Sequence, residues 1–537
     1  MALSLRHASV LVIDDFQGMR TMLRDFVRSM GTSKIDTASN GRDAIAQLSA
    51  NRYDIVICDY NLGPGPNGQQ VLEEARLKNL IGVATVWAMV TAEKTPEMVM
   101  GAAEVRPDDY LLKPINQVVL ETRLNRLIAR KHVLAPIEAA VKGLKYTEAI
   151  AQCDVQLKAR VAYPQEILRV KSDLLLAVGD YAAATTLFET ILATRDVPWA
   201  QTGLGKIHYH NRKFAQAKEI FAQVLRDHVV FMEASDWLAR ACTRMGQTEE
   251  AQQVLLNAVK ISPNSPNRQK TLGEVAYRNG ALDVAQTAFE KTIRIGEYSP
   301  YKAPTAYTGL ARVQADRDEP YEALKTLALS RQEFKYNTEA AMLTGASESM
   351  IYHQIGQTER AQSVMAETEK LLEKAAGSAS AEVGIAVARG LFALGYKDRA
   401  CLVLQDVVRN NHENQEVAES VELLFNDLDM HSEGQALIAQ CCGEVVAINN
   451  QGVTLAKGGD LQGGADLLRS ASTKLPNNEV ILINLCGLLI AMLSKEGKNL
   501  RLASEARDVL DRVRQINLRN KNYHIYTAAL NRIMAGR

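Results

Sequence analysis

Several features that would assign the chain to a common class of protein are missing from its sequence. Its 62 Lys and Arg residues are balanced by 62 Asp and Glu residues, so the formal net charge is zero. Binding to the phosphate backbone of nucleic acid needs an excess of positive charge, and a nucleic acid partner is therefore disfavoured. The longest apolar run, residues 480–493, contains Asn484 and is shorter than a membrane span, so we expect no membrane-spanning segment.

Cysteine is scarce as well. The 537 residues include seven cysteines and no CxxC pair, which argues against a cysteine-rich metal site. An odd number without regular spacing is typical of reduced thiols, so we expect a cytoplasmic protein. The apolar run near the N-terminus stops at Asp14 after four residues, which is too short for a signal peptide.

What the N-terminal part does contain is a series of short apolar runs that each end in polar side chains. Buried parallel strands read as continuous apolar runs, and their carboxyl ends meet at one edge of the sheet. We therefore expect the polar residues at these ends to lie together. In chain order they are two carboxylates, a carboxylate, a hydroxyl and an ammonium: Asp14 and Asp15, Asp59, Thr91, and Lys113.

This set of side chains is typical of phosphoryl transfer. Asp59 would be the nucleophile that becomes an aspartyl phosphate. Asp14 and Asp15 form an oxygen-only acidic pair, which suits magnesium, and the metal would offset charge on the phosphoryl oxygens. Lys113 would bring a second positive charge to the same phosphoryl group, and Thr91 a hydroxyl donor.

Residues 8–130 closely resemble the receiver domain of bacterial two-component response regulators. The resemblance rests on Asp14, Asp15, Asp59, Thr91-Ala92, Tyr110 and Lys113-Pro114. It implies an α/β flavodoxin-like fold with five parallel strands and five helices. It also implies that a histidine kinase or phosphotransfer protein phosphorylates Asp59, and that the bond between Lys113 and Pro114 is cis.

The same resemblance implies further roles. Tyr110 would be the switch aromatic that moves inward as Thr91 turns to the phosphoryl group. Asn61 would lend its backbone carbonyl to the magnesium ion held by Asp14, Asp15 and Asp59. Asn61 and Glu93, two residues after the acceptor and the threonine, would tune dephosphorylation and make the phosphoryl state short-lived. The loop at 61–68 is about one residue longer than the family norm.

From about residue 134 the pattern is helical and repeats. Small residues recur 33 or 34 positions apart, after a Gly or polar turn such as Gly280 or its equivalent Arg212: Ala184, Ala217, Ala251 and Ala285. Three of these alanines are followed four residues later by a phenylalanine: Phe188, Phe221 and Phe289. Leu204-Gly205 and Leu272-Gly273 precede two of the turns. Small residues would let helices approach closely, and the phenylalanines would fill the groove between repeats.

These features resemble the tetratricopeptide repeat, a helix–turn–helix unit of 34 residues. The resemblance implies an all-α superhelical solenoid whose groove binds proteins or peptides. Further alanines are spaced by 38 or 39 residues, at Ala323, Ala361 and Ala400, so about nine to eleven repeats are predicted. The predicted domains are a receiver at 1–131 and a solenoid at 132–537. The receiver's last helix, predicted at 116–130, would run into the solenoid without a flexible linker.

The function we expect is that of a response regulator whose solenoid sequesters or scaffolds a partner in a phosphorylation-dependent way. One alternative is a scaffold that works without phosphorylation. Another is an enzyme with an unrecognised site in residues 134–537, although these contain no Gly-rich phosphate loop, HExxH or GxSxG motif. We expect no enzyme activity beyond the receiver's own phosphoryl acceptance and hydrolysis.

Some properties stay open at this stage. The sequence does not name the kinase or the partner of the solenoid, nor does it give the direction of the switch. Receiver domains often pair through the face that contains residues 95–130, so a homodimer is an open alternative. Polar positions on the first helix of a repeat are candidates for the groove, among them Asn279, Asn450, Gln451 and Asn484.

Overall fold

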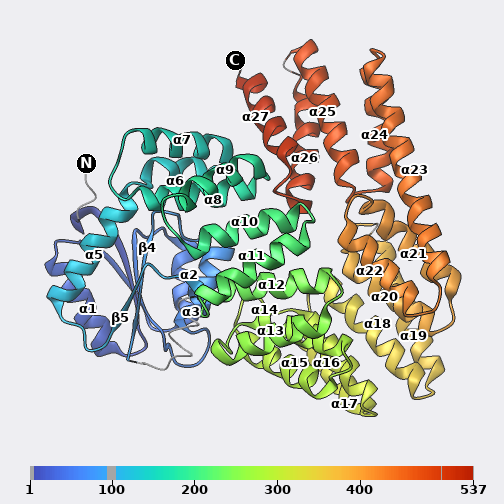
Figure 1. Cartoon of the computed structure of the whole chain (residues 1–537), viewed down its shortest axis with the longest axis horizontal. Coiled ribbons are helices and arrows are strands. Elements are labelled where there is room, and N and C mark those ends of the chain that lie inside the picture. Colours follow the sequence, from blue (N-terminus) through green and yellow to red (C-terminus); the bar gives the residue numbers. More distant parts are fainter. Residues whose placement is uncertain (1–4, 93–103, 376, 498, 536–537) are drawn as a thin grey trace. The chain divides into compact units, whose positions relative to one another are not determined.

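The structure is a computed structural model that describes residues 5–92, 104–375, 377–497 and 499–535. Its contacts divide the chain into two compact units, Met1–Ala303 and Pro304–Arg537. The first combines an α/β domain with a run of paired helices, and the second is entirely helical in its described part (Figure 1).

The α/β domain is built on a parallel sheet with the strand order β2-β1-β3-β4-β5. Its strands are β1 (Ser9–Ile13), β2 (Lys34–Ala38), β3 (Ile55–Asp59), β4 (Val86–Thr91) and β5 (Asp109–Leu112). Successive strands are added on one side of β1 up to β2 and then on its other side from β3 onward, so the direction of winding switches between β1 and β3. In such sheets, ligands bind at the carboxyl ends of the strands near that switch point. The predicted flavodoxin-like fold is confirmed.

Helices cover both faces of this sheet, which explains the uninterrupted apolar sequence of β1, β3 and β4. One core lies under α1 (Gln17–Ser29) and α5 (Gln117–His132), and the other under α2 (Gly41–Ala50) and α3 (Gly68–Leu77). Successive residues of these three strands alternate between the two cores, so all of their positions except Ser9 are buried. The remaining one of the five expected helices, between β4 and β5, falls largely on residues 93–103, which lie outside the described residues.

The passage from the sheet to the solenoid is short, as predicted. Asn116 accepts a hydrogen bond from the Val119 amide at 2.8 Å and caps α5, which ends at His132. The next helix, α6, begins at Ala135. Glu138 of α6 accepts a hydrogen bond from the amide of Ala84, at 2.8 Å, so side-chain contacts also hold the two parts together.

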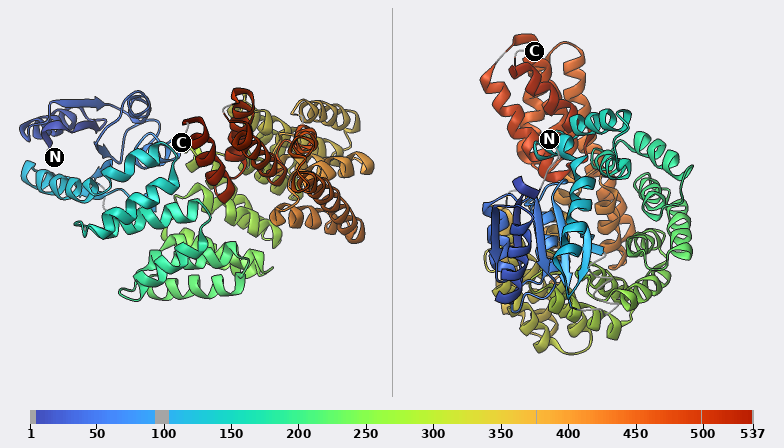
Figure 2. Two further views of the ribbon diagram at one scale, coloured as in Figure 1. Left: turned by 90° about the horizontal axis from the view of Figure 1, so that it is seen from above. Right: turned by 90° about the vertical axis from the view of Figure 1, so that its left-hand side faces the viewer.

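The helices that follow in the first unit pack in sequential pairs. They are α6 (Ala135–Lys142), α7 (Tyr146–Lys158), α8 (Pro164–Ala177), α9 (Tyr181–Leu192), α10 (Pro198–His210), α11 (Phe214–Asp227), α12 (Met232–Arg244), α13 (Thr248–Ile261), α14 (Pro266–Arg278) and α15 (Leu282–Gly296). Figure 2 shows them following a curved path, from teal to green, whose open side faces the sheet.

The repeat residues foreseen from the sequence make the expected contacts. A Cβ atom at Gly205 would lie 2.4 Å from the Phe221 ring, and one at Gly273 would lie 2.8 Å from the Phe289 ring. Only glycine therefore lets the two helices of each pair approach so closely. The turn at Gly280 has a φ of 71°, and Arg212 adopts the same left-handed conformation, with a φ of 63°.

The second unit continues the helical pairs. Its helices are α16 (Pro304–Asp316), α17 (Pro320–Glu333), α18 (Thr338–Gln354), α19 (Thr358–Lys374), α20 (Ala381–Ala393), α21 (Lys397–Asn410), α22 (Gln415–Asn426), α23 (His431–Lys457), α24 (Leu461–Lys474), α25 (Glu479–Glu496), α26 (Leu500–Ile516) and α27 (Lys521–Ala535).

One of these helices serves two repeats. α23 spans 27 residues, and Gly434 near its start packs against Phe425 of α22. Gly452 near its end packs against Leu468 of α24. The second helix of one pair thus continues into the first helix of the next, with no turn between the two repeats.

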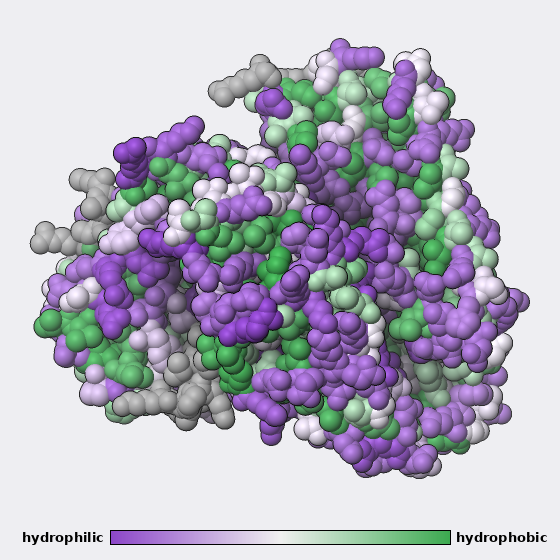
Figure 3. Space-filling view, in the orientation of Figure 1, coloured by the Kyte–Doolittle hydropathy of each residue, from purple (hydrophilic) through white to green (hydrophobic). Residues whose placement is uncertain are grey.

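Within the described ranges, none of the helices combines the length and the apolar character needed to cross a membrane. On the face drawn in Figure 3, hydrophilic side chains cover most of the helices, and the hydrophobic areas between them are small and scattered.

Candidate functional site

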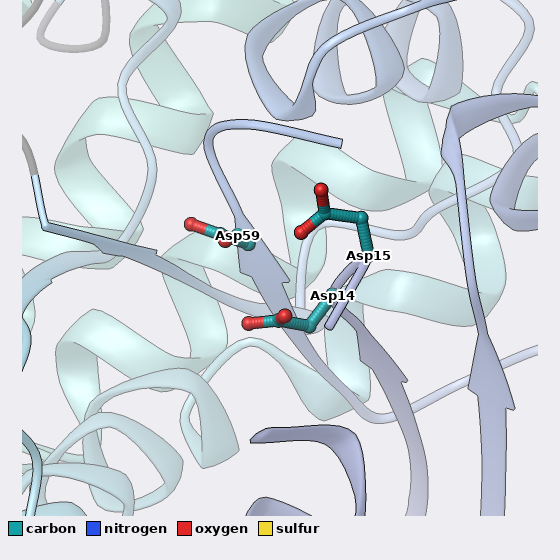
Figure 4. Close-up of side chains that lie close together, drawn as sticks. All are labelled: Asp14, Asp15 and Asp59. Atoms are coloured by element: carbon teal, nitrogen blue, oxygen red, sulfur yellow. The ribbon is translucent and has the colours of Figure 1, made fainter. Parts of the chain in front are cut away.

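Three carboxylates gather at the carboxyl ends of two neighbouring strands, β1 and β3. Asp14 and Asp59 are buried, with 0 % and 6 % of their surfaces exposed, whereas Asp15 is exposed. One oxygen of each carboxylate can be chosen so that all three lie within 4.8 Å of one another. Figure 4 shows the three side chains reaching into a common space. The predicted convergence of these residues is confirmed.

Lys113 links two of these carboxylates. Its Nζ atom donates to Asp59 Oδ2 at 2.7 Å and to Asp14 Oδ2 at 2.9 Å. The Lys113 amide continues the pairing of β5 with β4 by donating to the Thr91 carbonyl at 2.8 Å, and the bond to Pro114 is cis, as the resemblance implied. The ammonium group therefore reaches the acidic cluster from the end of β5.

The acidic pair after β1 is held by its own loop. Asp14 accepts a hydrogen bond from the amide of Phe16 at 2.9 Å. One nitrogen of the Arg20 guanidinium donates to the carbonyls of Asp14 and Asp15, at 2.6 and 2.8 Å. These bonds fix the backbone, so the carboxylates can face the cluster rather than turn into solvent.

The loop that follows Asp59 folds closely back on β3. The Gly68 amide donates to the carbonyl of Tyr60 at 2.8 Å, and the Tyr60 amide donates to Val90 at 2.9 Å. A Cβ atom at Gly68 would lie 2.1 Å from the Asp59 carbonyl oxygen, so no larger residue fits there. The position of the Asp59 carboxylate thus depends on a glycine nine residues further along the chain.

The charges of the site are unevenly balanced. Burial raises the pKa of Asp59, and Asp14 raises it further, while Lys113 lowers it. Burial alone would lower the pKa of Lys113, but its hydrogen bonds to Asp59 and Asp14 outweigh burial and raise it. Lys113 is therefore a firmly charged ammonium facing more than one carboxylate. The remaining negative charge and the oxygen-only ligands fit a hard divalent cation.

The remaining predicted residues are placed as follows. Thr91 is fully buried at the end of β4, and Tyr110 is half-buried in β5. Asn61 is exposed in the loop two residues after Asp59. Glu93 lies outside the described residues, so its assigned role in dephosphorylation stays a prediction. The roles of Asp59, Thr91, Tyr110 and Asn61 likewise stay predictions, although their positions agree with them.

Sequence reasoning missed two residues that shape this site. Arg20 belongs to no recognisable motif, and its only signal is a position about one helical turn after the acidic pair. Gly68 is one of several glycines in its loop, and nothing in the sequence distinguishes it.

In the solenoid, the amide of Asn279 donates to Thr248 and Gln252, and the amide of Asn484 donates to Asn449. These two candidates for the groove thus hydrogen-bond to the solenoid itself.

Comparison with known proteins agrees with both parts of the chain. The response regulator receiver domain family matches residues 10–125, and the tetratricopeptide repeat family matches residues 202–266. Chemotaxis protein CheY-3 of Vibrio cholerae is 28% identical over 125 residues, which are 23% of this chain and 95% of that protein. Chemotaxis protein CheY of Pseudomonas aeruginosa is 28% identical over 121 residues, 22% of this chain and 96% of that protein.

One solved structure is similar to part of this chain. A tetratricopeptide repeat protein from Parabacteroides merdae is 18% identical and covers 48% of this chain and 98% of its own, with a TM-score of 0.37.

Proposed function

We propose, from the premise that this chain joins a response regulator receiver domain to tetratricopeptide repeats, that phosphorylation of Asp59 controls a protein-binding solenoid. A histidine kinase or a phosphotransfer protein would supply the phosphoryl group. The solenoid would then sequester or scaffold a protein partner, with no catalytic domain as output and with the cytoplasm as its location. One observation carries the proposal: Lys113 Nζ lies 2.7 Å from Asp59 and 2.9 Å from Asp14.

The chemistry assigned to Asp59 is a displacement at phosphorus. A carboxylate oxygen of Asp59 attacks the phosphohistidine of the donor, and an O–P bond forms as the N–P bond breaks. The electron pair of the broken bond returns to the imidazole nitrogen of the donor. Lys113 already donates to Asp59, so its ammonium can donate to a phosphoryl oxygen on that residue.

The acidic cluster suits magnesium in this reaction. The carboxylates of Asp14, Asp15 and Asp59, with the backbone carbonyl of Asn61, would hold the ion, whose charge offsets that of the phosphoryl oxygens. The buried hydroxyl of Thr91 would donate to the phosphoryl group from the end of the neighbouring strand. Tyr110 lies on β5, three residues before Lys113, and would follow Thr91 inward.

A phosphoryl group on Asp59 would change the surface of the receiver. It adds negative charge next to Lys113 and Thr91, and it favours the arrangement of β4 and β5 that contacts the new oxygens. Asn61 and Glu93 would orient the water that later hydrolyses the acyl phosphate, so the phosphorylated state would be short-lived.

The test is small-angle X-ray scattering together with light scattering, in the presence of magnesium, with and without beryllofluoride. This anion stands in for the phosphoryl group on Asp59. We expect a change in shape or mass for the wild type and none for Asp59→Asn. The proposal of phosphorylation control is wrong if the two proteins respond alike, and a scaffold that works without phosphorylation would then be favoured.

A further inference from the structure

The receiver and the solenoid of the first unit meet through an arginine that is almost completely buried. Arg268 of α14 is 2 % exposed. Its guanidinium binds both oxygens of Asp236 on α12, at 2.7 and 2.9 Å. It also binds both oxygens of Glu104 on the receiver, at 3.1 and 3.0 Å. One cation of the solenoid is thus shared by a carboxylate of the solenoid and a carboxylate of the receiver.

A second shared charge of opposite sign lies nearby. Glu233 of α12 forms ion pairs with Lys206 of α10 and with Arg106 of the receiver. Burial alone would raise the pKa of Glu233, but the two cations outweigh burial and lower it, so the carboxylate stays ionised. The receiver therefore presents an acidic and a basic side chain two residues apart to a basic and an acidic side chain on the solenoid.

The two solenoid charges do not need the receiver in order to stay paired. If the receiver moves away, Arg268 keeps Asp236 and Glu233 keeps Lys206. A buried charge left without any partner would be strongly unfavourable, and this arrangement avoids that outcome. All four residues lie on α10, α12 and α14, the first helices of successive pairs, which are the helices expected to line a tetratricopeptide groove. The surface is therefore preformed.

The contact is also incompletely packed. A cleft of about 250 Å³ lies beside the Glu104 pair, with Gln69, Glu73 and Arg76 of the receiver on one side and Ser262, Pro266 and Tyr301 of the solenoid on the other. A permanent interface is close-packed, whereas polar contacts with gaps are typical of surfaces that separate. Arg76 of α3 donates to the carbonyls of Val105 and Arg106, so residues 104–106 are held on the receiver.

We propose that the inner face of α12 and α14 is a ligand-binding site for a protein segment that carries a carboxylate and, two residues later, a cationic side chain. In the conformation seen here, Glu104 and Arg106 of the receiver occupy this site. The segment supplies the carboxylate in one ion pair and the cation in the other. These two pairs set its register, because a reversed or shifted segment would bring like charges together. A partner with the same pattern of charges competes with the receiver for the site.

This inference deepens the proposed function and rests on it for its control. Residues 104–106 lead directly into β5, which carries Tyr110 and ends next to Lys113. A phosphoryl group on Asp59 that rearranges this strand would shift Glu104 and Arg106 on the solenoid and release the site. While tethered, the receiver competes at a high effective concentration, so even a modest local shift would change the access of a partner.

The test uses the full chain and a fluorescent synthetic peptide with the sequence of residues 104–110, followed by anisotropy. We expect the double variant E104Q/R106Q to bind the peptide at least tenfold more tightly than the wild type, because the internal competitor has lost both charges. Adding Glu233→Gln should reverse most of this gain. The matched control is E74Q/K78Q, which removes the ion pair between Glu74 of α3 and Lys78 just after this helix and should leave binding at the wild-type level.

Equal binding by the wild type and E104Q/R106Q, or no binding by either, would overturn the assignment of this site. Measurements with beryllofluoride test the binding site and its regulation by phosphorylation separately. If it tightens peptide binding by the wild type, both the site and the phosphorylation control are supported. If the double variant gains affinity but beryllofluoride has no effect, the site stands and the proposed control by phosphorylation is wrong. If beryllofluoride changes the scattering of the wild type but E104Q/R106Q gains no affinity, the control stands and the site is wrong.

Discussion

Two cations, one partly buried and one almost completely buried, organise the first unit, and each is shared by two carboxylates. Lys113 lies between Asp14 and Asp59 in the receiver, and Arg268 lies between Asp236 and Glu104 where the receiver meets the solenoid. The first group is built within one sheet, from the ends of β1, β3 and β5. The second joins α12 and α14 of the solenoid to a receiver segment that precedes them by more than 100 residues.

This difference decides how far each group can be read from the sequence. A parallel sheet brings the ends of its strands together whatever the details of packing, so apolar runs that end in charged residues are enough to predict the receiver site. No comparable rule relates Glu104 to Arg268. Their meeting depends on how a curved row of helices packs against the receiver, which periodicity does not reveal.

The largest effect is expected from removing the phosphoryl acceptor itself. Asp59→Asn should abolish phosphorylation by acetyl phosphate in the presence of magnesium, because the amide is not a nucleophile for phosphorus. Intact mass spectrometry would show the loss of the added phosphoryl mass. Asp25→Asn, which changes an exposed carboxylate on α1, is the matched control and should retain full phosphorylation. Phosphorylation of the Asp59→Asn chain would mean that another residue is the acceptor.

The next effect concerns stability and tests the shared cation of the receiver. Lys113→Met should lower the free energy of unfolding by about 3–5 kcal/mol in the presence of a chelator, because Asp14 and Asp59 are then buried without their cation. Magnesium should restore part of this loss by binding the same carboxylates. Urea unfolding with and without magnesium measures both effects. An equal loss in the two conditions would contradict a metal site at these carboxylates.

Removing the other shared cation should cost less and should not respond to metal. Arg268→Met takes away four hydrogen bonds to Asp236 and Glu104, but the side chains of these two acids are 34 % and 23 % exposed, so water can replace part of what is lost. We expect a loss of about 2–3 kcal/mol in the first unit. The measurement is the same urea unfolding, and a magnesium-dependent loss would contradict the contrast between the two groups.

Much of the architecture could be predicted because its rules are local. Four of the five strands follow from apolar runs, whereas β2, whose side chains are mostly exposed, was implied only by the family resemblance. The close helix contacts follow from the spacing of Ala184, Gly205 and Phe221. The role of Gly68 could not be predicted, because it arises from the fold of its loop against the Asp59 carbonyl. The merging of two repeats in α23 was equally hidden, since a helix that continues leaves no turn residue to mark the boundary.

The smallest effect tests a contact that was foreseen from the sequence, in contrast to the Arg268 group. Gly205→Ala would place a methyl group 2.4 Å from the Phe221 ring, so α10 and α11 must move apart or the ring must leave its rotamer. We expect a loss of about 1–3 kcal/mol in thermal or urea unfolding. Gly296→Ala is the matched control, because no atom lies within 4 Å of the added methyl group.

The control should leave stability unchanged or raise it slightly, since alanine is a better helix former than glycine. If both variants lost the same stability, the glycine at position 205 would matter for its backbone freedom rather than for the approach of the phenylalanine ring. The repeat would then be specified by its turns and not by close packing. The turn residues, and not the pairing of glycine with phenylalanine, would be what makes the solenoid predictable from the sequence. A loss confined to Gly205→Ala supports packing, because the same added methyl group meets the Phe221 ring at position 205 and open space at position 296.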